Sequence, residues 1–212
     1  MSRVEGHSTQ IDERSTRVRV VQRHLPVIRR AWLRVEVWLP ALLLFGAALT
    51  LRLYRLDAQP LWLDEGQTWA QVTRSRFSTL LIDLVRPSQA YPLFHLLLKW
   101  DTRLLGDSEW ALRLPSALAG ALAVPAIFAL GRELRGWLPG IIAALLLLVS
   151  PFAIWQAQDA KAYSLVLLTS IVLAWTLARA LRLKTRSSWL IFSAVAVIAP
   201  FVHRLLLLTL IG

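Results

Sequence analysis

The chain of 212 residues contains no cysteine and few charged residues. Without cysteine it can form neither a disulfide framework nor a thiolate metal site. Charged residues make up 17% of the sequence and hydrophobic residues 56%, and the mean hydropathy is +0.53. This composition is far more apolar than that of an ordinary soluble domain, and it predicts a membrane protein.

Acidic residues are also scarce, so that 24 Lys and Arg against 13 Asp and Glu give a net charge of +11. Such an excess can indicate a nucleic-acid partner, because basic surfaces attract phosphate backbones. Here the basic residues gather in residues 1–36, around Arg132 and in 179–186, between apolar runs. That placement is typical of cytoplasmic segments under the positive-inside rule. We therefore expect no nucleic-acid partner, and an N-terminal tail that contacts anionic membrane lipids.

Several long runs contain almost no charge over a length close to the ~20 residues that cross a bilayer. They cover residues 38–51, 114–130, 137–155 and 163–178. We expect an all-α fold, a polytopic transmembrane helical bundle, with a basic cytoplasmic tail at 1–36 and a transmembrane domain at 37–212. A basic helix is expected near 27–37, and the first span, 38–54, is interpreted as an uncleaved signal anchor.

Residues 55–112 separate the first two spans and are expected to form an external loop. Within them, residues 91–105 are apolar, but His95, Lys99, Thr102 and Arg103 recur at helical spacing. This pattern predicts an amphipathic helix that lies in the membrane interface.

The order of spans then predicts that 114–130 runs inward, 137–155 outward, 163–178 inward and the segment from Trp189 outward. The external face would collect a set of polar groups from separate parts of the chain: Asp64, Glu65, His95, Lys99, Arg113, Asp159, Lys161 and His203.

Asp64 and Glu65 are the leading candidates for chemistry. They follow Leu61, Trp62 and Leu63, so an apolar anchor would hold a carboxylate pair at the membrane surface. Partial desolvation and a like-charged neighbour both favour the protonated form, which suits a general base. The alternative is that both acids cap a short helix beginning near Gly66.

The other candidates also have structural interpretations. Asp159 can decorate the first turn of the returning span, and Lys161 can extend to lipid headgroups. No two His residues have recognisable metal-ligand spacing, so no metal ligands are predicted, although the sequence leaves a divalent metal open as a cofactor.

The sequence also resembles the membrane glycosyltransferases of the protein O-mannosyltransferase and aminoarabinose transferase type, with a GT-C fold of the glycosyltransferase family 39 kind. The resemblance runs through most of 51–208 and is carried by the order of short motifs: Leu51-Arg52-Leu53, Leu61-Trp62-Leu63-Asp64-Glu65, Tyr91-Pro92-Leu93-Phe94-His95, Gly106-Asp107-Ser108-Glu109-Trp110 with Arg113-Leu114-Pro115, Gly131-Arg132-Glu133-Leu134, Ser150-Pro151-Phe152, Gln158-Asp159-Ala160-Lys161-Ala162-Tyr163 and Phe201-Val202-His203.

The resemblance implies a bundle of many transmembrane helices with interfacial helices in the first external loop. It implies a sugar donor on polyprenyl phosphate, an inverting transfer, and a loop aspartate as the base. That role falls on Asp64, with Glu65 as its neighbour.

Two departures from the family pattern affect the expected donor contact. The family often has His-Pro-Pro where this chain has Ala90-Tyr91-Pro92, and often Arg where it has Lys161. Lysine keeps the charge but cannot form a two-pronged contact with phosphate. Family members are also much longer, so the chain is expected to be an N-terminal part that is incomplete at its C-terminus and inactive alone.

The sequence therefore predicts a glycosyltransferase of the plasma (inner) membrane, with its N-terminus cytoplasmic and its active site external. Asp64 and Glu65 are the expected catalytic residues, and the residues expected to bind the donor phosphate or substrate are His95, Arg113, Asp159, Lys161 and Tyr163. The expected partners are a polyprenyl-phosphate-linked sugar, membrane lipids, and a lipid, glycan or protein acceptor. A transporter or flippase of lipid-linked intermediates, and a non-catalytic membrane scaffold, remain as alternatives.

Overall fold

The computed structural model describes residues 38–85 and 92–208, and the elements within these ranges are all helical. An apolar helix, Trp38–Leu53, comes first. It is followed by α2 (Leu63–Arg74), α3 (Phe77–Val85), α4 (Pro92–Leu105), α5 (Glu109–Arg135), α6 (Trp137–Leu148), α7 (Pro151–Ala157), α8 (Tyr163–Leu183), α9 (Arg186–Val202) and the 3-10 helix η1 (Arg204–Leu207). The all-α prediction is confirmed for this part of the chain. The predicted tail helix at 27–37 lies outside the described residues.

Two of these helices, α5 and α8, are long and apolar enough to cross a membrane. The expected span at 137–155 is instead broken into α6 and α7, which are bent by 62° against each other. Ser150 and Pro151 cause this break, because Ser150 adopts an extended N-cap conformation and Pro151 opens a new helix at its first position. Trp38–Leu53 and α9 are shorter apolar helices.

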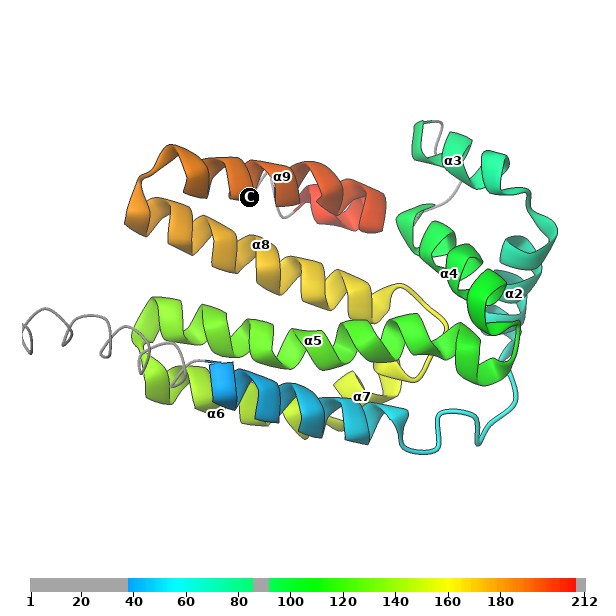
Figure 1. Ribbon diagram of the computed structural model, residues 1–212, viewed down its shortest axis with the longest axis horizontal. Helices are drawn as coiled ribbons and strands as arrows, with labels where there is room; N and C mark the ends of the chain where they lie inside the picture. The colour runs from blue at the N-terminus through cyan, green and yellow to red at the C-terminus, as the bar shows by residue number, and fades with distance from the viewer. Residues whose placement is uncertain (1–37, 86–91, 209–212) are drawn as a thin grey trace, which may run out of the picture. The chain divides into compact units, whose positions relative to one another are not determined.

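Helix α5 lies between α6 and α8, and α8 is covered by α9 on its other side (Figure 1). Small residues allow these close contacts. A Cβ atom on Gly131 would lie 2.7 Å from the Cα of Gly140, so α5 and α6 approach each other almost backbone to backbone. The adjacent core of Leu44, Ala48, Val124 and Phe128 packs the first helix onto the same pair.

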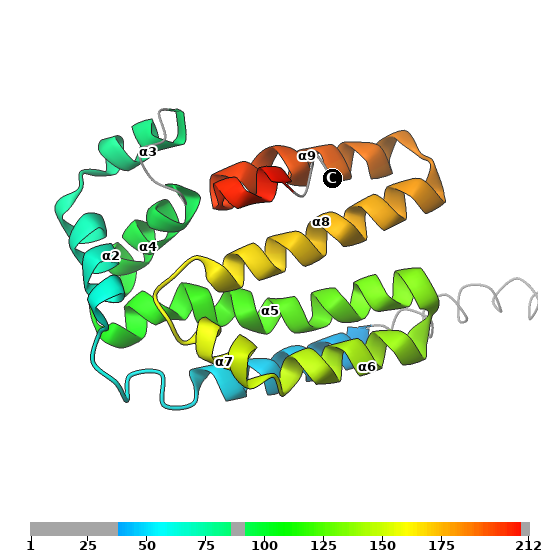
Figure 2. The same cartoon turned by 180° about the vertical axis from the view of Figure 1, so that it is seen from behind.

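A second core lies at the opposite end of α5, where α2, α3 and α4 gather (Figure 2). It unites residues from α2, α4, the start of α5 and the segment that precedes α8: Val72, Phe94, Leu98, Leu112, Ala160 and Ala162. This core brings the segment after α7 against the first turns of α2 and α5. The helix expected at 91–105 is observed as α4, but its polar residues do not form an exposed face. His95 is buried and Lys99 donates to the carbonyls of α2, whereas Trp100 is exposed.

The C-terminal ends of α5 and α8 and the start of α9 lie together at the end of the bundle remote from α2 (Figure 1). The last turns of α5 and α8, and the start of α9, contribute a group of basic residues: Arg132, Arg135, Arg179, Arg182, Lys184 and Arg186. Glu133 forms ion pairs with Arg179 and Arg182. One end of the helical bundle is therefore strongly basic, as the distribution of charge in the sequence predicts.

Candidate active site

Helix α2 begins directly before the two acidic residues that the sequence singles out. Trp62 is its N-cap and Leu63 its first residue, so the helix starts earlier than the predicted position near Gly66. Neighbouring helical residues point about 100° apart. Asp64 therefore faces outward and is exposed, whereas Glu65 points into the protein and is 1% exposed. Two adjacent carboxylates thus have different environments.

Glu65 caps the helix, as the alternative interpretation of the sequence proposed. Its Oε2 accepts a hydrogen bond of 3.0 Å from the backbone N–H of Trp62, which would otherwise lack a helical partner. The same side chain forms a buried, two-pronged ion pair with Arg113. The Arg113 Nε donates to Oε1 at 2.9 Å, and Nη2 donates to Oε2 at 2.7 Å.

The Glu65 carboxylate is ionised despite its burial. Burial alone would raise its pKa, but hydrogen bonds from Arg113 and from the backbone N–H groups of Ala160 and Trp62 lower the pKa below its ordinary value. A carboxylate with four donors and a lowered pKa is a poor proton acceptor. Its geometry makes Glu65 a residue that joins α2, α5 and the segment before α8.

Arg113 has no free donor for a substrate phosphate. A guanidinium carries five N–H groups, and two of them bind Glu65. The other three donate to the backbone carbonyls of Leu56, Gln59 and Pro60, at 2.9, 2.9 and 3.3 Å. All five N–H groups of Arg113 are thus used within the protein, and three of them fold the loop in front of α2.

The segment between α7 and α8 is held in place by backbone contacts. The N–H of Ala160 donates to Glu65 Oε1 at 2.8 Å, and Ser116 Oγ donates to the carbonyl of Lys161 at 2.8 Å. Ala160 and Ala162 are buried, so the side chains of Asp159 and Lys161 are left on the other side of the segment. Asp159 does not cap α8, whose N-cap is Ala162.

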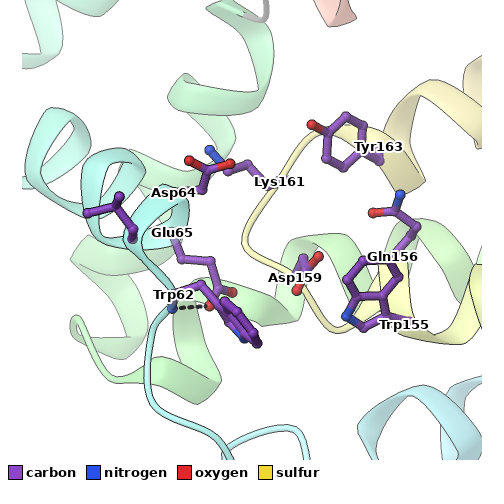
Figure 3. A pocket seen from close by; sticks show the side chains of 9 residues that line it. Trp62, Asp64, Glu65, Trp155, Gln156, Asp159, Lys161 and Tyr163 are labelled. Atoms are coloured by element: carbon purple, nitrogen blue, oxygen red, sulfur yellow. Dashed lines mark hydrogen bonds between the residues drawn. The ribbon is translucent and has the colours of Figure 1, made fainter.

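These two segments enclose a cavity of about 470 Å³ (Figure 3). Nine residues line it: Trp62, Leu63, Asp64, Glu65, Trp155, Gln156, Asp159, Lys161 and Tyr163. In Figure 3, Asp64 and Lys161 lie at one side of the cavity, and Trp155 and Gln156 at the other. A neighbouring cavity of about 570 Å³ shares Trp62, Trp155 and Asp159 with it and includes Arg113 in its wall.

The cavity unites five of the seven residues predicted from the sequence, namely Asp64, Glu65, Asp159, Lys161 and Tyr163. His95 is buried on α4 and lines neither cavity. The sequence analysis placed Trp62 only in an apolar anchor and Trp155 only at the end of the apolar run 137–155. Their positions beside charged residues are the signal that could have identified them, because ligand pockets are lined mainly by apolar and aromatic side chains with a few polar groups.

Besides Glu65, two acids line the cavity, Asp64 and Asp159, and they differ in their surroundings. Burial, and next the charge of Glu65, raise the pKa of Asp159, while Arg113 and Lys161 act in the opposite direction. The Asp64 carboxylate is exposed and has no hydrogen-bond or ion-pair partner among the described residues. In the same ranges, no three His, Cys, Asp or Glu side chains come together as a candidate metal site. Within the part of the chain that the structure describes, Asp64 is thus the more exposed of the two carboxylates that line the cavity without a hydrogen-bond partner, the other being Asp159.

Apolar helices long enough to cross a membrane, with a carboxylate-bearing cavity at one end of the bundle, define an integral membrane protein with a candidate ligand site. The family model described as dolichyl-phosphate-mannose-protein mannosyltransferase matches residues 86–211. The chain belongs to this family and is a membrane glycosyltransferase by membership. No curated protein matches the chain, and no solved structure does. Asp159, Lys161 and Tyr163 lie within the matched region, whereas Asp64 and Glu65 precede it.

Proposed function

We propose that the chain transfers a sugar from a polyprenyl-phosphate donor to an acceptor hydroxyl or amine, with inversion at the anomeric carbon. One observation carries this proposal: a single cavity joins the exposed carboxylate of Asp64 to Lys161, from a segment almost one hundred residues away. A base and a cation in one cavity suit a displacement that needs a deprotonated nucleophile and a stabilised anionic leaving group.

In the proposed step, Asp64 accepts the proton of the acceptor O–H or N–H while the acceptor atom bonds to the anomeric carbon. The bond between that carbon and the phosphate oxygen breaks, and its electron pair departs with the polyprenyl phosphate. A single carboxylate suffices, because the phosphate is a good leaving group. Glu65 is too well supplied with hydrogen bonds to share this role, so we assign it to positioning Asp64.

Lys161 and Tyr163 are the proposed contacts of the donor phosphate. An ammonium group stabilises the charge that develops on the leaving oxygen, and the tyrosine hydroxyl can donate to a second phosphate oxygen. Trp62 and Trp155 are 63% and 57% exposed, and supply apolar surface for the sugar or the first isoprene unit. Asp159, beside Lys161, is placed to accept hydrogen bonds from sugar hydroxyls.

We place the cavity on the external face of the plasma (inner) membrane. The basic ends of α5 and α8 would then face the cytoplasm, as the positive-inside rule requires. The cavity lies at the other end of α5, beside α2 and the start of α8. Helices α2, α3 and α4 would lie along the outer interface.

Family membership favours glycosyl transfer over the transporter and scaffold alternatives. The direct test is an assay of the purified full-length protein with a polyprenyl-phosphate sugar of known anomeric configuration, followed by NMR analysis of the product. Inversion at the anomeric carbon is expected. A product with retained configuration would require a covalent or double-displacement route and would contradict a single carboxylate acting as base.

A further inference from the structure

Arg52 is a buried arginine that the proposed reaction does not use. It lies in the last turn of the helix Trp38–Leu53, and it is 0% exposed. Its guanidinium makes two long hydrogen bonds, from Nη1 to the carbonyl of Ala48 at 3.3 Å and from Nη2 to the carbonyl of Leu147 at 3.4 Å. It pairs with no carboxylate in the described part of the chain, and its Nε has no hydrogen-bond partner there. An unpaired buried cation is costly, which points to a specific role.

The carbonyl of Leu147 explains why a donor is needed at this point. Leu147 is the second-last residue of α6, so its carbonyl has no helical N–H partner. In a continuous helix the partner would be the N–H of residue 151, and here residue 151 is a proline, which has none. Arg52 donates to this otherwise unpaired acceptor at the point where α6 and α7 bend by 62°.

The surroundings of Arg52 are shaped to admit its side chain. A Cβ atom on Gly120 of α5 would lie 3.0 Å from the Arg52 Nε and 2.6 Å from the Cβ of Ala157. Ala157, the last residue of α7, is fully buried. Glycine at 120 therefore allows the first helix, α5 and α7 to meet around the guanidinium.

The backbone of Arg52 is joined to the same region. Gln158, which directly follows α7, donates through Nε2 to the carbonyls of Arg52 and Tyr54, at 3.2 and 2.9 Å. The end of α6, just before the bend, is thus connected to the side chain of Arg52, and the residue that follows α7 is connected to its carbonyl. Helix α7 and the residues after it supply Trp155, Gln156 and Asp159 to the cavity.

We propose that Arg52 is a positioning residue that fixes the bend between α6 and α7, and so holds one wall of the cavity in place. The structural part of this proposal stands on the contacts above, whereas its effect on sugar transfer rests on the proposed function. The geometry gives Arg52 a role at a distance from the reacting atoms, since it lines neither of the two cavities.

The absence of cysteine from the chain allows a local test with single introduced cysteines. Ala153→Cys reports on α7, and Ala144→Cys, on α6 before the bend, is the matched control, since both alanines are buried. In the full-length protein, Arg52→Met is expected to make Cys labelling at 153 faster while labelling at 144 stays slow. Arg52→Lys keeps a cation and a hydrogen-bond donor, so the cysteine introduced at position 153 should be labelled more slowly in this variant than in Arg52→Met.

Sugar transfer is measured on the same variants without the cysteines. A displacement of about 1 Å at a reacting site can lower a rate by about 100-fold, so Arg52→Met is expected to reduce transfer roughly 10- to 100-fold, with partial recovery in Arg52→Lys. Unchanged labelling at both positions would overturn the proposal, and so would equal exposure of both, because the effect would then be a general loss of fold. Faster labelling at 153 alone with normal transfer would confirm the positioning of α7 and contradict the cavity as the site of transfer.

Discussion

The ion pair between Glu65 and Arg113 should control the stability of the whole site, and the substitution Glu65→Gln tests this. Both side chains are almost completely buried, at 2% and 3% exposed. Glutamine has nearly the same shape as glutamate, so the change removes charge without leaving a cavity. Its NH₂ group would face the N–H donors of Arg113 and Trp62 that now bind Oε2.

The expected loss in the free energy of unfolding follows from the buried charge of Arg113, which Glu65→Gln leaves without a partner. Removing one partner of a buried ion pair typically costs about 3–5 kcal/mol, because the other charge stays buried without compensation. For a protein of this size, 1 kcal/mol changes Tm by about 2–4 °C, so Tm should fall by about 6–20 °C. Glu109→Gln is the matched control, since Glu109 also lies in the first turn of a helix but makes no ion pair in the described ranges. This control is expected to lower the free energy of unfolding by about 0.3–1 kcal/mol.

The same interaction predicts how stability depends on pH. The pKa of Glu65 is lowered in the folded state, so its contribution is fully present above the unfolded value of about 4.3 and is lost as the pH falls through the lower folded value. Thermal unfolding of purified protein in detergent, measured at neutral pH and below pH 4, should show the variant and the wild type converging in acid. A Glu65→Gln variant as stable as Glu109→Gln at neutral pH would refute this account of the ion pair.

Three further predictions concern the face and the chemistry of the cavity. An impermeant thiol reagent should label Asp107→Cys in intact cells and Lys184→Cys only after permeabilisation; the reverse pattern would invert the proposed topology. Lys161→Met should raise the KM for the donor roughly 10- to 100-fold, which corresponds to the loss of one hydrogen bond to a charged group, and Lys161→Arg should retain donor binding. Because burial and Glu65 raise the pKa of Asp159, its ionisation opposes folding above the unfolded pKa of about 3.9; Asp159→Asn should therefore be at least as stable as the wild type at pH 7, with no difference below pH 4, while transfer falls.

Much of the fold follows from the pattern of apolar runs. The runs at 114–130 and 163–178 predict the cores of α5 and α8, and the periodic polar residues of 91–105 predict α4. The break between α6 and α7 was also present in the sequence, because Ser150 followed by Pro151 is a typical helix start. We predicted a continuous span instead, because the run 137–155 is almost entirely apolar. Hydropathy measures the affinity of a segment for the membrane and does not report where a helix bends.

The different environments of Asp64 and Glu65 could not be predicted from the residues themselves, although the family resemblance implies different roles. The two residues have the same chemistry and adjacent positions, and the sequence gives no sign of which one is buried. Glu65 acquires its function from Arg113, 48 residues away, and from Ala160, 95 residues away. Arg113 likewise has a charge that suits a phosphate, but three loop carbonyls accept hydrogen bonds from its N–H groups. Such assignments depend on long-range contacts that no local pattern encodes.

The most direct test of the central claim is the rate of sugar transfer by Asp64→Asn in the full-length protein, measured alongside donor binding. Asparagine matches aspartate in size and also tolerates a position near a helix start, so folding should be unaffected. Loss of a general base typically lowers the rate by about 10²- to 10⁴-fold. Asp57→Asn, another exposed acid of the same loop that lines neither cavity, is the control and should transfer normally. The account predicts that Asp64→Asn binds the donor as the wild type does and transfers almost no sugar; a variant that binds the donor and transfers it at the wild-type rate would contradict the assignment of Asp64 as the base.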